Sequence, residues 1–176
     1  MNYATIKKRD IANGIGVRVS LFVSGCTHHC KNCFNKETWD FSYGEPFTQD
    51  TVNLILDYLA PDFVNGLSLL GGEPFEVQNQ GALLELLRQV KARYPQKDVW
   101  CYTGYLYDKD LLKDSRARCE YTDEMLSYID ILVDGPYIEA QKDISLQFRG
   151  SKNQRIIDVK RSLESGEVVL WDKILK

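Results

Sequence analysis

The segment that decides the fold is VRVSLFVSGCTHHCKNCFN, residues 17–35. Its first eight residues, 17–24, are rich in β-branched and aromatic side chains and stop at Gly25, a pattern that predicts a β-strand. The next ten residues, CTHHCKNCFN (26–35), contain three of the chain's five cysteines and both of its histidines. We therefore expect a strand whose carboxyl end leads into a cysteine-rich loop.

The rest of the chain alternates between predicted helices and strands. Apolar side chains at helical spacing predict helices at residues 48–60, 79–94 and 122–129. Runs of β-branched and aromatic residues predict strands at 66–70, 98–103 and 129–133, with later ones at 154–159 and 167–171. The polar segment 105–121 is expected to hold a short helix and a loop.

This alternation predicts the fold class. Strands that alternate with helices imply βαβ units and a parallel sheet. The first four strands end in GC..C..C, GGEP, YTGY and VDGPY, and ligands in parallel α/β folds bind beyond such carboxyl ends. A chain of 176 residues is short for an eight-stranded barrel of about 250 residues. We therefore expect an α/β fold, a partial (β/α) barrel of mostly parallel strands, as a single domain over 1–176 in which 160–176 is a C-terminal extension.

Composition and charge limit the class of protein, its partners and its compartment. Hydrophobic residues make up 44% of the chain and charged residues 27%, as in an ordinary globular protein. The net charge of −3 gives no electrostatic reason to expect nucleic acid or an anionic membrane as the partner. The N-terminus lacks the apolar core of a signal peptide, and no apolar run is long enough to span a bilayer. We expect a cytoplasmic protein whose thiols stay reduced.

The cysteine cluster has two interpretations from its spacing, C-x3-C-x2-C at Cys26, Cys30 and Cys33. Reduced cysteines this close indicate a metal site or catalysis. A [4Fe–4S] cluster normally takes four thiolates, so three leave one iron without a protein ligand. A structural zinc site is the alternative and needs a fourth ligand. The candidates for that ligand are His28, His29, Cys101 and Cys119. The usual C-x2-C partner pair is absent, which weighs against zinc. The histidines are expected to be solvated loop residues or neighbours of the cluster, and not ligands.

The order of two motifs points to a known superfamily. GGEP, Gly71 to Pro74, follows the cysteine motif and ends the second predicted strand, although alone it reads as an ordinary turn. Together the two motifs resemble the radical S-adenosylmethionine superfamily. Residues 13–47, WCYTGY, ILVDGPYI and FRGSKNQRIID closely resemble a narrower family, the activating proteins of anaerobic ribonucleoside-triphosphate reductase.

The resemblance implies two cofactors. A [4Fe–4S] cluster would be bound by Cys26, Cys30 and Cys33. Its open iron would chelate the amino and carboxylate groups of S-adenosylmethionine. In the family, the glycine-rich strand end contacts that amino group, and this role maps onto Gly71 to Glu73, that is Gly71, Gly72 and Glu73.

The same resemblance places the adenine beside Asn32, Cys33 and Phe34. Many superfamily members carry an aromatic residue just before the third cysteine, whereas here Asn32 stands there and Phe34 follows. Weaker candidates for contacts with the cofactor or partner are Tyr102, Thr103, Gly104, Asp134, Arg149, Asn153 and Gln154. No residue is expected to act as a general acid or base.

The implied function is activation of the reductase. Reductive cleavage of S-adenosylmethionine at the cluster would give a 5′-deoxyadenosyl radical, which would take hydrogen from a glycine of the reductase large subunit. A low-potential electron donor such as flavodoxin is the other expected partner. The alternatives are an activase of another glycyl-radical enzyme, a small-molecule radical enzyme, a ferredoxin, and a zinc-stabilised binding module without catalysis.

Overall fold

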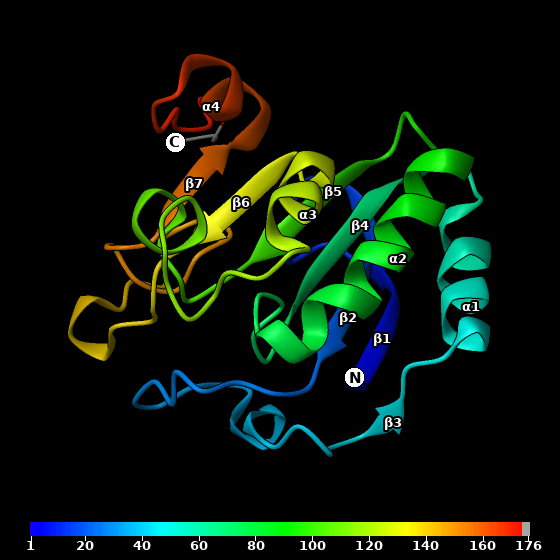
Figure 1. Cartoon of the computed structure of the whole chain (residues 1–176), viewed down its shortest axis with the longest axis horizontal. Coiled ribbons are helices and arrows are strands. Elements are labelled where there is room, and N and C mark those ends of the chain that lie inside the picture. Colours follow the sequence, from blue (N-terminus) through cyan, green and yellow to red (C-terminus); the bar gives the residue numbers. More distant parts are fainter. Residues whose placement is uncertain (174–176) are drawn as a thin grey trace.

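Four parallel strands form the centre of the sheet in the computed structural model, which describes residues 1–173 (Figure 1). The seven strands lie in the order β3-β1-β2-β4-β5-β6-β7. Their bounds are β1 Asn2–Asp10, β2 Val17–Val23, β3 Glu45–Pro46, β4 Val64–Gly71, β5 Asp98–Tyr102, β6 Ile131–Asp134 and β7 Arg155–Asp158. The helices are α1 Gln49–Leu59, α2 Val77–Arg93, α3 Thr122–Tyr128 and α4 Val159–Ser165, with short turns of other helix types at Lys36–Trp39, Tyr107–Leu111 and Glu139–Gln141.

The strand pairings confirm the α/β class but not the expected barrel. The pairs β2–β4, β4–β5 and β5–β6 are parallel, and helices α1, α2 and α3 connect them in turn. The outer pairs β1–β2, β1–β3 and β6–β7 are antiparallel. The sheet is therefore mixed and open at both edges.

Strand β1 was not predicted from the sequence. Its residues NYATIKKRD carry four consecutive charges, and most of its side chains are exposed or half-buried. Such a strand shows weak alternation, because only part of one face packs on the core. It pairs with β2 on one side and β3 on the other, so it protects the edge of the parallel core.

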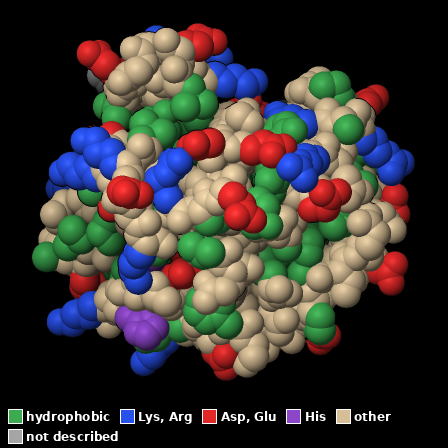
Figure 2. Space-filling view, in the orientation of Figure 1, with side chains coloured by type: hydrophobic (Ala, Val, Ile, Leu, Met, Phe, Trp, Pro, Cys, Tyr) green, Lys and Arg blue, Asp and Glu red, His purple; other side chains and the backbone are tan. Residues whose placement is uncertain are grey.

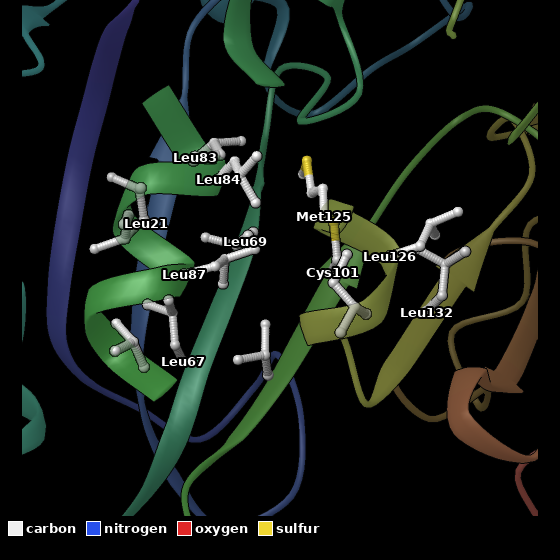
Figure 3. Packing of buried hydrophobic residues seen from close by; sticks show 14 of the residues in the cluster. Leu21, Leu67, Leu69, Leu83, Leu84, Leu87, Cys101, Met125, Leu126 and Leu132 are labelled. Carbon is white, nitrogen blue, oxygen red and sulfur yellow. The ribbon is translucent and has the colours of Figure 1, made fainter. Parts of the chain in front are cut away.

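One main hydrophobic core lies between the sheet and the helices. Leu67 and Leu69 of β4 face Leu83 and Leu87 of α2, and all four side chains are fully buried (Figure 3). Farther along the same layer, Cys101 of β5 packs among α3 and β6 side chains. This confirms the view of Cys101 as a buried apolar residue.

The other face of the sheet is covered by loops and by the C-terminal segment. Trp100 of β5 packs against Phe148 and Trp171, with ring centroids 5.2 Å apart in both pairs. The expected strand at 154–159 is confirmed as β7, but the expected strand at 167–171 is wrong. After α4 that segment returns alongside β7, but the contact is limited to an isolated antiparallel bridge between Ile157 and Leu170, with two main-chain hydrogen bonds of 2.9 and 2.8 Å beside it. Residues 174–176 of the expected C-terminal extension lie outside the described part of the chain.

Candidate functional site

A cavity of about 440 Å³ opens at the carboxyl ends of the four parallel strands. All four loops predicted to share one mouth contribute to it, so that prediction is confirmed. In Figure 1 the loop after β2 and the segment before β7 approach each other at the lower left. The residues that carry the argument are Cys26, Cys30, Cys33, Phe34, Gly71, Gly72 and Glu73, with Tyr102 and Arg149.

Main-chain hydrogen bonds hold the loop that follows β2. The Gly25 amide donates to the Thr38 carbonyl at 2.7 Å, and the Cys33 amide donates to the Cys30 carbonyl at 3.1 Å. His29 and Asn32 adopt left-handed backbone angles, with φ of 50° and 57°. These turns fold the loop so that all three cysteines face the same cavity. In Figure 2, where charges of both signs are interspersed over the visible face, histidine atoms mark this loop at the lower left.

The three thiols form a donor set suited to a cluster. Burial raises the pKa of Cys26 to about 12 and also raises the pKa of Cys30. Within residues 1–173, no three His, Cys, Asp or Glu side chains converge on a point where they would hold one metal ion. A structural zinc ion takes four ligands on one ion, whereas the cysteines of a [4Fe–4S] cluster each bind a separate iron atom.

The raised pKa of Cys26 leads to a pH prediction. The thiolate is the nucleophile, so alkylation follows the thiolate fraction. In the metal-free protein, the rate of Cys26 alkylation by iodoacetamide should still rise about tenfold per unit above pH 9. A thiol with a pKa of about 8.5 levels off there. Mass spectrometry of the Cys26 peptide measures the rate, and continued protection of Cys101 shows that the fold is intact. A plateau for Cys26 below pH 10 would contradict the prediction.

The two glycines of GGEP allow β4 to end directly against β2. Gly71 has φ of +103°, and a Cβ there would lie 2.7 Å from the Val23 amide nitrogen. A Cβ at Gly72 would lie 2.6 Å from the Gly25 carbonyl oxygen. The Gly72 and Glu73 amides donate to the Val23 and Gly25 carbonyls at 2.7 and 2.8 Å. The motif therefore joins the turn to the start of the cysteine loop through backbone contacts.

Glu73 lies beneath this turn with only 1% of its surface exposed. Its carboxylate accepts hydrogen bonds from the Phe75 and Gly104 amides, both at 2.8 Å, and from the Thr103 hydroxyl at 2.8 Å. The fourth contact is with Nε2 of His28, at 2.7 Å. The side chain is thus occupied by protein groups. The Glu73 carbonyl is also occupied, by the Glu76 amide at 3.1 Å and the Asn79 side-chain amide at 3.0 Å, so a ligand would meet the turn at its glycines.

Phe34 and Asn32 lie differently with respect to the cavity. Phe34 lines it and is 77% exposed, with its ring 6.1 Å from that of Tyr137 and beneath the Lys142 ammonium. Asn32 is not among the lining residues. Its side chain instead helps, after Tyr137, to lower the pKa of Glu139. The predicted set is therefore brought together except for Asn32.

Three residues that line the cavity carry a buried polar atom with no hydrogen-bond partner within the described residues. These atoms are the Trp39 Nε1, the Tyr102 hydroxyl and the Nε of Arg149. Such atoms are costly to bury unless a ligand or water satisfies them. They fit a polar cofactor. The third strand end and the RGSKNQ segment were the sequence signals for Tyr102 and Arg149, which lay outside the main predicted set.

Asp134, also considered as a ligand contact, has a structural role in the described part of the chain. Its buried carboxylate accepts from Arg155 at 3.0 and 2.6 Å and from the Tyr107 amide at 2.8 Å. Asp134 and Arg155 therefore fix the end of β6 to β7. Local sequence pattern could not predict this pair, since 21 positions separate the two residues.

Comparison with known proteins agrees with this geometry. Residues 12–157 match the family described as "4Fe-4S single cluster domain". The structure and this match define the class: an α/β protein of the 4Fe-4S single cluster family.

Individual relatives narrow the class. An anaerobic ribonucleoside-triphosphate reductase-activating protein of Vibrio cholerae is 43% identical over 89% of this chain and 97% of its own length. Proteins of the same name from Enterobacteria phage T4 and Escherichia coli K12 are each 40% identical, over 89% and 88% of this chain and 93% and 96% of their own lengths. The chain belongs to the family of anaerobic ribonucleoside-triphosphate reductase-activating proteins, which confirms the resemblance seen in its motifs. No helix within residues 1–173 is both long and apolar enough to cross a membrane.

Proposed function

We propose that this protein activates an anaerobic ribonucleoside-triphosphate reductase through radical chemistry at the cavity. The observation that carries the proposal is the meeting of the C-x3-C-x2-C loop and the GGEP turn in one cavity. Membership of the activating-protein family supports it. In this proposal the protein is an enzyme, and its substrate is a glycine of the reductase large subunit.

Different residues would bind the two cofactors. Cys26, Cys30 and Cys33 would hold a [4Fe–4S] cluster, and the backbone of Gly71, Gly72 and Glu73 would accept the amino group of S-adenosylmethionine. When bound, these cofactors supply the electron and the 5′-deoxyadenosyl radical that removes hydrogen from the glycine.

The adenine contact is assigned to the segment Asn32 to Phe34. Phe34 offers an exposed apolar ring at the cavity, whereas Asn32 would act through the shape of the turn between Cys30 and Cys33. The remaining work of the chain is to orient the bound groups and exclude water, for which a walled cavity is suited. This role needs no general acid or base.

The type of α/β fold, the extent of the domain, the electron donor and the compartment are also proposals. Strands β2, β4, β5 and β6 with helices α1 to α3 would constitute a partial (β/α) barrel, and residues 1–176 a single domain with 160–176 as an extension. A low-potential donor such as flavodoxin would reduce the cluster before each turnover. Five free cysteines suit a reducing compartment such as the cytoplasm.

The proposed function is tested with the reductase from the same genome. The anaerobically reconstituted and reduced protein, given S-adenosylmethionine, should release 5′-deoxyadenosine and produce a glycyl radical signal on the reductase in electron paramagnetic resonance. Cleavage without that signal would indicate another target. A colourless protein that carries stoichiometric zinc would overturn the radical proposal altogether.

Replacing Phe34 with alanine should weaken S-adenosylmethionine binding roughly tenfold, because stacking of a base on an aromatic ring contributes about 1–3 kcal/mol. Isothermal titration of the cluster-loaded protein measures this change. Phe63→Ala is the matched control, since Phe63 is 61% exposed and lies outside the cavity. Equal affinities for the Phe34→Ala and Phe63→Ala variants would remove Phe34 from the adenine site.

A further inference from the structure

Glu73 connects three segments of the chain, its own turn, the end of β5 and the cysteine loop, through one buried carboxylate. Its Oε1 accepts from the Phe75 amide and the Thr103 hydroxyl, and its Oε2 accepts from the Gly104 amide and His28. A carboxylate offers about four lone-pair sites, so these contacts use its full capacity. Since 1% of the residue is exposed, loss of any of these donors would leave a buried acceptor unsatisfied.

His28 is the only one of these four donors that belongs to the cysteine loop. It lies between Cys26 and Cys30, and its Nε2 is 2.7 Å from Glu73. Its ring packs edge-on against Tyr105 at 4.4 Å between centroids. It also lies against Gly104, where a Cβ would be 2.7 Å from the ring. The side chain is 13% exposed, so contacts on several sides fix its position.

Thr27, the neighbour of His28, also bonds the cysteine loop to the segment that follows β4. The amide and hydroxyl of Thr27 both donate to Oε1 of Glu76, at 2.7 and 2.6 Å. The cysteine loop is therefore bound to the segment GGEPFE by two consecutive residues, Thr27 and His28. Glu73 carries the contact farther, to the end of β5.

His29 provides a contrast within the same loop. Its ring stacks on Trp39 at 4.4 Å, and its backbone has φ of 50°. Trp39 belongs to the short helical turn Lys36–Trp39, which follows the cysteines in the same connection. His29 thus stacks within its own loop, and within residues 1–173 its side chain makes no hydrogen bond or ion pair to the ends of β4 or β5.

We propose that His28 is a positioning residue that, through Glu73, couples the cysteine loop to the GGEP turn, and that His29 has no such role. The coupling sets the placement of Cys26 and Cys30 relative to the backbone that would receive S-adenosylmethionine. Only this last consequence rests on the proposed function, because the contacts themselves belong to the protein without cofactors.

A competing role for His28 is that of a metal ligand. Since Nε2 donates to a carboxylate, Nδ1 is the free acceptor, and metal-binding histidines often have a carboxylate partner of this kind. In that role His28 would occupy the open iron and compete with S-adenosylmethionine. In the positioning role, His28 favours S-adenosylmethionine binding, because it holds the cysteine loop against the turn that would receive this cofactor. The two roles therefore predict opposite effects of removing the side chain.

The first experiment uses the full-length metal-free protein under reducing conditions, at one pH. His28→Ala should raise the rates of Cys26 and Cys30 alkylation by iodoacetamide roughly tenfold, the size expected from losing a buried hydrogen bond to a charged group. His29→Ala should leave both rates within about twofold. His28→Gln, whose amide also donates, should restore part of the protection. Cys101, buried in the core, reports any loss of the fold.

Glu73→Gln completes the design. It should raise the alkylation rates of Cys26 and Cys30 at least as much as His28→Ala does, because it weakens the same contact and also removes a charge that raises the pKa of both thiols. The double variant should be no more reactive than Glu73→Gln alone, because the contact with His28 is then already weakened. If Glu73→Gln exposes Cys101 and so fails to fold, the comparison of His28→Ala with His28→Gln decides alone. Equal reactivity of the His28→Ala and His29→Ala variants would overturn the proposal.

The second experiment uses the cluster-loaded protein. S-adenosylmethionine should alter the electron paramagnetic resonance spectrum of the reduced wild-type cluster, and the concentration needed should rise roughly tenfold in His28→Ala but not in His29→Ala. Tighter S-adenosylmethionine binding in His28→Ala would make His28 a ligand and refute the positioning role. A wild-type cluster that does not respond to S-adenosylmethionine would refute the proposed function, while the alkylation result would stand.

Discussion

Replacing Cys30 with alanine should abolish both cluster loading and the release of 5′-deoxyadenosine. Loss of an outer-shell partner alone typically lowers metal affinity 10–100-fold, and loss of a direct ligand should exceed about 100-fold. Cys30 has no substitute close by, because Cys101 is buried in the core and Cys119 is hydrogen-bonded to Gln80 at 3.4 Å on another part of the chain. Iron and sulfide content per chain, with product release measured in parallel, checks the result.

The matched control is Cys119→Ala. Cys119 is half-buried, as Cys30 is, but it does not line the cavity. Its removal should leave cluster content and 5′-deoxyadenosine release unchanged. If Cys119→Ala lost the cluster while Cys30→Ala kept it, the assignment of the metal ligands would be wrong. If both variants kept it, the cysteine loop would not be the cluster site.

The parallel core of the fold could be predicted because its strands are buried on both faces. Such strands read as short apolar runs between glycines, as in GLSLL and DVWCYT. The antiparallel edges could not be predicted in the same way. In β1 the pattern is obscured by Lys7, Lys8 and Arg9, which face solvent, and after β7 the chain turns into α4. Register and closure depend on pairing between distant segments, which local pattern does not contain.

The candidate site likewise has features that could be predicted from the sequence and features that could not. Cysteine spacing and the GGEP turn were readable, because each lies within a few consecutive residues. The contacts of Glu73 with His28 and Thr103 span 45 and 30 positions, and the partnerless atoms of Tyr102 and Arg149 depend on what the fold leaves around them. Only the folded chain shows that the Glu73 carboxylate is used for internal contacts.

Replacing Gly71 with alanine should reduce the free energy of unfolding by about 2–6 kcal/mol. The φ of +103° costs an L-residue about 1–3 kcal/mol. The new Cβ would also lie 2.7 Å from the Val23 nitrogen and 2.8 Å from Phe22 main-chain atoms. Backbone atoms in the middle of a sheet cannot move aside as a flexible side chain can, so overpacking adds about 1–3 kcal/mol. Urea unfolding of the metal-free, reduced protein measures the change.

Gly166→Ala separates the two contributions. Gly166 also has a positive φ, +73°, but its Cβ would meet nothing within 4 Å. Gly166→Ala should therefore lower the free energy of unfolding only through the cost of the positive φ, about 1 kcal/mol. The excess for Gly71→Ala is the cost of separating β4 from β2 at the point where the GGEP turn meets the cysteine loop. If the two variants were equally stable, the glycine would be needed only for its backbone angle. Because that junction orders both halves of the cavity, Gly71→Ala should also weaken S-adenosylmethionine binding, while Gly166→Ala, on α4, should not.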